Sequence, residues 1–211
     1  MEQVLEKGFE VEIDRGEVRR LLGIKEYRAA APRVEEAIEQ MMSLAAGMIE
    51  PMGIYTIIKG DDFPGSSRFV GLERVALGIC TIGKRLEEQV SEFSRTNRLL
   101  DALVLDSVGS VAAEAAAEYL DGVIQDAAHD MGLKTSCRAS PGYGDWDVRE
   151  QESIFAVLSG AEIGVSLTDS FMMVPRKSVS FAIDIAERPA RMRSADSCRE
   201  CPIVDCPYRL I

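Results

Sequence analysis

The longest helical pattern in the chain runs over residues 98–131, and Gly109 is a point at which the helix could pause. Small side chains make one turn of this stretch nearly bare of bulk: Ala112, Ala113, Ala115, Ala116 and Ala117. The distance between packed helices depends on the side chains at the contact. We therefore expect either a neighbouring element or a ligand to come close to this backbone.

Shorter helices are predicted around the long one. Asp14, followed three residues later by Glu17, has the spacing of a capping box and predicts a short helix that Gly23 stops. A second helix is expected between residues 32 and 51, since its apolar residues recur at spacings of three and four. A third helical pattern covers residues 84–96.

Strands are predicted where β-branched or alternating apolar residues gather. These segments are residues 8–13, 53–60, 68–83, 134–140, 164–174 and 177–186. A further helix should follow the turn at 141–146, capped by Asp147 with Glu150 three residues on. Strands and helices mix without a strict βαβα alternation, so the pattern favours an α+β fold over a doubly wound sheet.

Length and charge limit the classes of function. The 211 residues have a mass of 23.1 kDa, which suits one domain, here placed at residues 1–190 with a tail at 191–211. Lys and Arg number 24 against 35 Asp and Glu, a net charge of -11 that argues against nucleic-acid and anionic membrane partners. We expect a cytoplasmic protein, because no secretory signal or bilayer-length apolar run is seen.

Three of the five cysteines crowd the tail, as Cys198, Cys201 and Cys206. Their close spacing is typical of thiolate ligands, with Cys137 as a conceivable fourth for zinc or an iron-sulfur cluster. Three free thiols at the end of the chain are the alternative. The single histidine, His129, excludes sites that need several histidines.

The segment 138–146, RASPGYGDW, carries the most chemical information. Arg138 could hold a carboxylate through two parallel hydrogen bonds. Gly142 permits a backbone geometry that other residues resist, and Tyr143 offers a hydroxyl and a π face that attracts a sulfonium or ammonium centre. An ordinary strand-to-helix turn with a surface arginine is the simpler interpretation.

Together with LTDSFMMVPRKSVS at 167–180, AEAAAEYLDG at 113–122 and CTIGKRLEE at 80–88, this segment resembles the activation domain of cobalamin-dependent methionine synthase. The resemblance covers residues 75–185. It implies a single α+β domain with a mainly antiparallel, twisted sheet and flanking helices. It also implies a domain that binds S-adenosylmethionine.

The resemblance further implies roles for individual residues. Arg138 would hold the methionine carboxylate, and Glu114 would bond the ribose hydroxyls or the α-ammonium group. Ser140 and Tyr143 would contact the ligand mainly through backbone atoms near the glycine turn at Gly142. Asp14 would correspond to another acidic ligand of the family near its N-terminus, although its first role is to cap the helix.

The function implied is that of a stand-alone reactivation factor, an accessory to the methyltransferase. It would serve a cobalamin-binding methionine synthase core, or another corrinoid protein, in trans, with flavodoxin or ferredoxin as electron donor. The alternatives are a corrinoid activator that carries an iron-sulfur cluster or zinc, and a docking protein that does not bind S-adenosylmethionine.

Overall fold

The computed structural model describes residues 2–25, 29–65 and 67–189. Its main sheet is antiparallel throughout, with strand order β1-β2-β3-β7-β4. These strands are β1 (Val4–Lys7), β2 (Met52–Ile58), β3 (Arg74–Thr81), β7 (Ser178–Ala186) and β4 (Lys134–Thr135). A separate pair is formed by β5 (Ser166–Leu167) and β6 (Met173–Val174).

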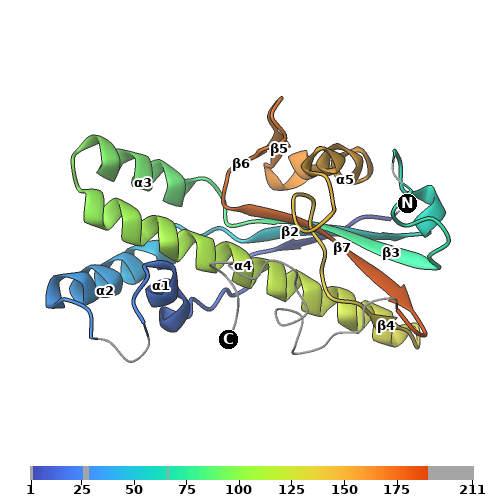
Figure 1. The fold of residues 1–211 in the computed structure, drawn as a ribbon, viewed down its shortest axis with the longest axis horizontal. Helices are drawn as coiled ribbons and strands as arrows, with labels where there is room; N and C mark the ends of the chain where they lie inside the picture. Colours follow the sequence, from blue (N-terminus) through green and yellow to red (C-terminus); the bar gives the residue numbers. More distant parts are fainter. Residues whose placement is uncertain (1, 26–28, 66, 190–211) are drawn as a thin grey trace.

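Helices cover both faces of the sheet (Figure 1). They are α1 (Arg15–Leu21), α2 (Pro32–Ala46), α3 (Arg85–Arg95), α4 (Leu99–Asp130) and α5 (Gln151–Val157). Three short 3₁₀ turns lie at Gly60–Asp62, Val148–Glu150 and Gly160–Ile163. The predicted α+β fold with an antiparallel sheet is confirmed.

The central strand β3 is buried on both faces, which explains its nearly continuous apolar sequence. Ala76 and Cys80 face a core built with α1 to α4. Val75, Leu77 and Ile79 face a second core built with α5, the third 3₁₀ turn and the loop after β2. The sheet therefore separates two cores.

Helix α4 runs unbroken through Gly109, where the sequence allowed a break in the helix. A Cβ at Gly109 would lie 2.6 Å from Cδ2 of Leu86, so the glycine leaves room for the α3 side chain. The alanine-rich turn serves the same purpose, since Ala112, Ala116 and Ala117 are fully buried in the first core. Close packing of neighbouring elements accounts for these small residues.

Several predicted strands differ from the structure. The first strand ends before residue 8, because Gly8 adopts a φ of +67° and its amide donates to the Pro51 carbonyl. Residues 9–13 keep their alternation because Phe9, Val11 and Ile13 pack on the first core. The predicted strand at 134–140 is reduced to β4 and a bridge between Ala139 and Ala182.

The other differences are at element ends. The predicted strand at 164–174 forms only β5 and β6, which pair with each other across a turn. The strand predicted from residue 68 begins at Arg74, and the second helix ends at Ala46 before Gly47. Among the helices of the described ranges, none has both the length and the apolar character needed to cross a bilayer.

Candidate functional site

Arg138 and Glu114, 24 positions apart in the sequence, form an ion pair. The Nη2 atom of Arg138 lies 2.5 Å from Oε1 of Glu114. The segment after β4 positions the arginine, because the neighbouring Ala139 exchanges both backbone hydrogen bonds with Ala182 of β7. Helix α4 positions the glutamate. The structure thus brings together the two residues expected to hold the charged ends of a ligand.

Helix α4 presents two further carboxylates on the same face. Glu118 lies four residues after Glu114, and Asp121 lies seven residues after Glu114. The three side chains therefore lie on successive turns of one face. Oδ2 of Asp121 lies 3.6 Å from Nε of Arg138. The side chain of Asp121 is only 9% exposed, whereas that of Glu114 is 56% exposed. Sequence reasoning missed Asp121, although its seven-residue spacing from Glu114 could have indicated it.

Within the described residues, Glu114, Glu118 and Asp121 gather around Arg138. The pKa of Glu118 is raised above its ordinary value, first by partial burial and then by repulsion from Glu114, while Arg138 opposes the rise. Asp121 and Glu17 of α1 add smaller repulsions. This face of α4 is therefore suited to a ligand that brings positive charge as well as a carboxylate for the arginine.

A ring lies near the arginine on the sheet side. The guanidinium carbon of Arg138 is 5.7 Å from the ring centroid of Phe181, which is fully buried on β7. The Phe181 ring fits because β3 has a glycine opposite, where a Cβ at Gly78 would lie 2.6 Å from the ring. The absence of a side chain at Gly78 therefore leaves room for the Phe181 ring that lies beside Arg138.

The nearby thiol of Cys80 is inert at neutral pH. Burial raises its pKa to about 12, and the charge of Arg138 only partly offsets that rise. A buried thiol of this pKa stays protonated at neutral pH and is therefore a poor nucleophile. The chemistry of the site consequently depends on its charges.

The glycine turn after Arg138 is anchored through Trp146, which is buried in the second core and meets Phe69 edge to face. Gly142 adopts a φ of +89°, and its amide donates to the Trp146 carbonyl. The amide of Tyr143 donates to the carbonyl of Ser140. The turn itself uses these two amides and the carbonyls of Ser140 and Tyr143, so a ligand would meet mainly its side chains.

Tyr143 is exposed, with 72% of its surface open to solvent, and Ser140 is half-buried. Asp14 does cap α1, because its Oδ1 accepts from the amides of Gly16 at 2.6 Å and Glu17 at 3.4 Å. The geometry therefore agrees with the capping role given to Asp14.

A second cation reaches α4 further toward its start. The Nζ atom of Lys177 lies 2.8 Å from Oδ1 of Asp106 and 2.9 Å from Oγ of Ser110. Its side chain is 11% exposed. This Lys177 clamp ties the segment before β7 to the same helix that carries Glu114.

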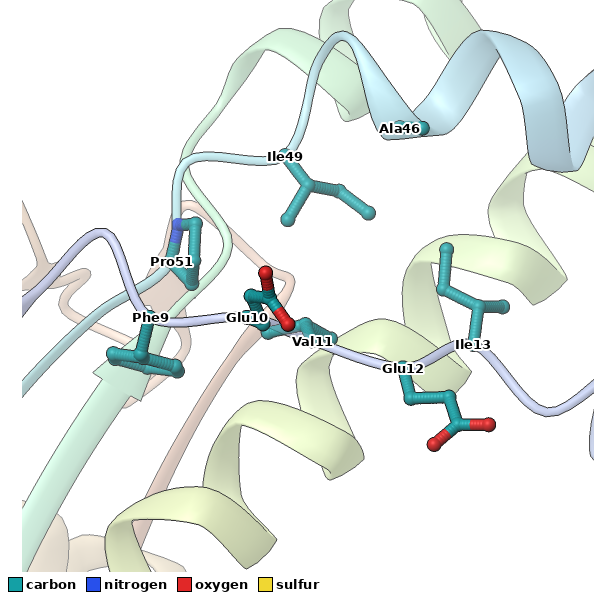
Figure 2. A pocket seen from close by; sticks show the side chains of 8 residues that line it. All are labelled: Phe9, Glu10, Val11, Glu12, Ile13, Ala46, Ile49 and Pro51. Carbon is teal, nitrogen blue, oxygen red and sulfur yellow. The ribbon is translucent and has the colours of Figure 1, made fainter.

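A hollow of about 520 Å³ lies beside the N-terminal segment, where Ile13 and Ile49 face each other across it (Figure 2). Its lining residues are Phe9, Glu10, Val11, Glu12, Ile13, Ala46, Ile49 and Pro51. Phe9 stacks on Tyr119 of α4 with ring centroids 4.0 Å apart. None of the residues predicted for the site lines this hollow, which is a seam between the N-terminal segment and α2.

Metal ligation was predicted at Cys198, Cys201 and Cys206, which lie outside the described residues. Within residues 2–25, 29–65 and 67–189, no group of three or more histidine, cysteine or acidic side chains is arranged to hold a metal ion. Cys137, the conceivable fourth ligand, is half-buried.

Comparison with solved structures gives a strong structural likeness. The crystal structure of the MetH reactivation domain bound to AdoHcy superposes with a TM-score of 0.62 at 14% identity, covering 92% of this chain and 81% of that one. A nitroreductase candidate from Bacillus subtilis gives a TM-score of only 0.31 at 13% identity, over 81% of this chain and 87% of that one. A search of curated proteins found no match.

The family comparison covers the segments that carry the site. The family model described as the vitamin B12 dependent methionine synthase activation domain matches residues 67–194. This range includes β3, the whole of α4, the glycine turn and β7. The chain belongs to the family of activation domains of vitamin B12-dependent methionine synthase.

Proposed function

We propose that this domain binds S-adenosylmethionine and reactivates a cobalamin-dependent methyltransferase, with methionine synthase as the expected partner. The observation that carries the proposal is the arrangement of Arg138 against the carboxylates of α4. S-adenosylmethionine has one carboxylate close to two positive centres, an ammonium and a sulfonium. The site offers complementary charges, since the guanidinium of Arg138 lies beside the carboxylates of α4.

Each site residue then has a distinct role. Arg138 binds the methionine carboxylate, and Glu114 turns from the arginine to the ammonium group or the ribose hydroxyls. The exposed ring of Tyr143 covers the ligand from the glycine turn, and Ser140 and Gly142 line the same side. The neighbouring structure in the comparison contains AdoHcy, the species that remains when S-adenosylmethionine has given up its methyl group.

The partner supplies the cobalamin and accepts the methyl group. We place the activation domain at residues 1–190 and the tail at 191–211, and we propose that a corrinoid protein meets the domain in trans. After one-electron reduction by flavodoxin or ferredoxin, the corrinoid accepts the sulfonium methyl. The domain's contribution is positioning, since holding the methyl donor toward the corrinoid makes the transfer effectively unimolecular.

Calorimetry with S-adenosylmethionine tests the ligand. The protein should bind it, and Arg138→Ala should weaken binding about 100-fold, as expected when one partner of a charge-assisted pair is removed. Arg95→Ala is the matched control, because Arg95 is an exposed arginine that pairs only locally with Glu92 on α3. Absence of binding, or equal affinity in the wild-type and Arg138→Ala proteins, would refute the assigned site.

A reconstituted reaction tests the role. The domain, a methionine synthase core, cob(II)alamin, reduced flavodoxin and S-adenosylmethionine should yield the methylated corrinoid and AdoHcy in equal amounts. Methylation should be lost when Arg138→Ala replaces the wild-type protein and kept with Arg95→Ala. An equal rate without the domain would show that it has no part in reactivation.

A further inference from the structure

Two carboxylates meet different parts of the Arg138 guanidinium. Glu114 meets the terminal Nη2 atom at 2.5 Å, and Asp121 lies beside Nε at 3.6 Å. The two differ sharply in exposure, at 56% for Glu114 and 9% for Asp121. One carboxylate is therefore open to solvent and to ligands, and the other is enclosed by the fold.

This difference decides which carboxylate can be exchanged. An exposed carboxylate that leaves an arginine is rehydrated at little cost. A buried carboxylate cannot be rehydrated in this way, so separating it from a neighbouring cation is costly. Helix α4 also fixes Asp121, since Leu120 beside it and Ile124 one turn on are fully buried. Asp121 consequently keeps its place while Glu114 can give way.

A guanidinium is a rigid plane, so a contact beside Nε fixes the direction of the terminal nitrogens. We propose that Asp121 is a positioning residue, which holds Arg138 from the buried side so that its terminal nitrogens face a ligand carboxylate in place of Glu114. This inference rests on the proposed function and adds a residue to it. The Phe181 ring, 5.7 Å from the guanidinium carbon, limits movement on the sheet side.

The first test needs no ligand. The Nε–H signal of Arg138 in a ¹⁵N NMR spectrum is assigned by its loss in Arg138→Lys. Asp121→Asn should shift this signal and lower its order parameter, whereas Glu114→Gln should leave the order parameter high. An unchanged order parameter in Asp121→Asn, or an equal fall in Glu114→Gln, overturns the proposal.

The second test uses two ligands that differ in one group. Asp121→Asn should weaken S-adenosylmethionine binding by about tenfold, the lower end of the loss seen when groups that orient ligand-holding side chains are removed. Decarboxylated S-adenosylmethionine should bind wild type and variant equally, because it has no carboxylate for Arg138 to meet. An equal loss for both ligands would show a general structural effect and reject positioning.

Thermal unfolding checks that each variant is folded. If Asp121→Asn does not fold, Asp121→Glu keeps the charge but moves it by one methylene, and it should give smaller changes in the same direction in both tests. If the wild-type protein binds neither ligand, the proposed function fails, while the NMR measurement still decides whether Asp121 orders Arg138.

Discussion

Two cations reach the same helix, and they do so in different ways. Lys177 meets one carboxylate and one hydroxyl, from Asp106 and Ser110, so its charge is balanced within the clamp. Arg138 lies among three carboxylates of the described residues, those of Glu114, Glu118 and Asp121. The Lys177 clamp is a closed contact of one carboxylate and one hydroxyl, whereas the Arg138 site includes Glu114, a carboxylate with a 56% exposed side chain.

The packing around the two cations differs in the same sense. Near Lys177, a Cβ added to Gly109 would lie 3.2 Å from its Cε atom and 2.6 Å from the buried Leu86. At Gly122, the residue after Asp121, an added Cβ would meet no atom of the described residues within 4 Å. The first region is filled by the fold, and the second has space along the helix.

Removing the lysine charge should have the largest effect on stability. Lys177→Met keeps the unbranched chain as far as the Cε atom but loses both polar contacts, and it should lower the free energy of unfolding by about 1–2 kcal/mol. Urea unfolding measures this loss. The affinity for S-adenosylmethionine should stay at the wild-type value. A loss of affinity as large as that expected for Arg138→Ala would show that Lys177 also takes part in binding.

Filling the tight region should come next. Gly109→Ala gains helix propensity of about 1 kcal/mol, but overpacking against Leu86 costs about 1–3 kcal/mol. The net loss should be about 1 kcal/mol in the same unfolding measurement. A gain in stability would show that the first core near Lys177 yields more easily than its geometry indicates.

The matched change in the open region should have the opposite sign. Gly122→Ala also gains helix propensity, here without a clash, and should raise the free energy of unfolding by about 0.5–1 kcal/mol. Thermal unfolding of the two glycine variants side by side tests the comparison. Equal effects of Gly109→Ala and Gly122→Ala would show that the two positions in α4 do not differ in packing.

The smallest effect is expected from the charge of Glu118. Because the folded-state pKa of Glu118 lies above its ordinary value of 4.5, its charge destabilises the fold at neutral pH. This cost is relieved as the pH falls through the raised pKa toward the ordinary one. Glu118→Gln should therefore gain about 0.2–0.5 kcal/mol at pH 7, the size of a like-charge pair one turn apart.

The gain from Glu118→Gln should fade below about pH 4.5, where Glu118 is protonated in both states. Unfolding at a series of pH values for the variant and the wild type provides the check. A gain that does not depend on pH would mean that the glutamate is unfavourable for a reason other than its charge.

Local signals in the sequence were sufficient for the helices. Asp14 was predicted to cap the first helix, and its side chain accepts from the amides of Gly16 and Glu17. The pattern over 98–131 predicted the long helix to within one residue of each end. Caps and periodicity are properties of neighbouring residues, so they can be identified without knowledge of the fold.

The strands were less predictable because pairing is decided by distant partners. The alternating residues 9–13 satisfy a strand pattern, yet they form no strand, and their apolar side chains pack against the first core. Strand β1 forms instead from the four residues before Gly8. In the segment 134–140, β7 pairs with only a few positions. Alternation indicates a segment with one buried side, and only the tertiary structure shows what buries it.

The sequence by itself determined the α+β composition, the long helix, and the two residues of opposite charge, Glu114 and Arg138, that the fold brings together. The tertiary structure decided that these two meet directly, that Asp121 lies beside them in a buried position, and that Lys177 forms a closed contact on the same helix. The reason is physical. Residue chemistry is written in the sequence, but burial and distance arise only when segments far apart in the chain pack together.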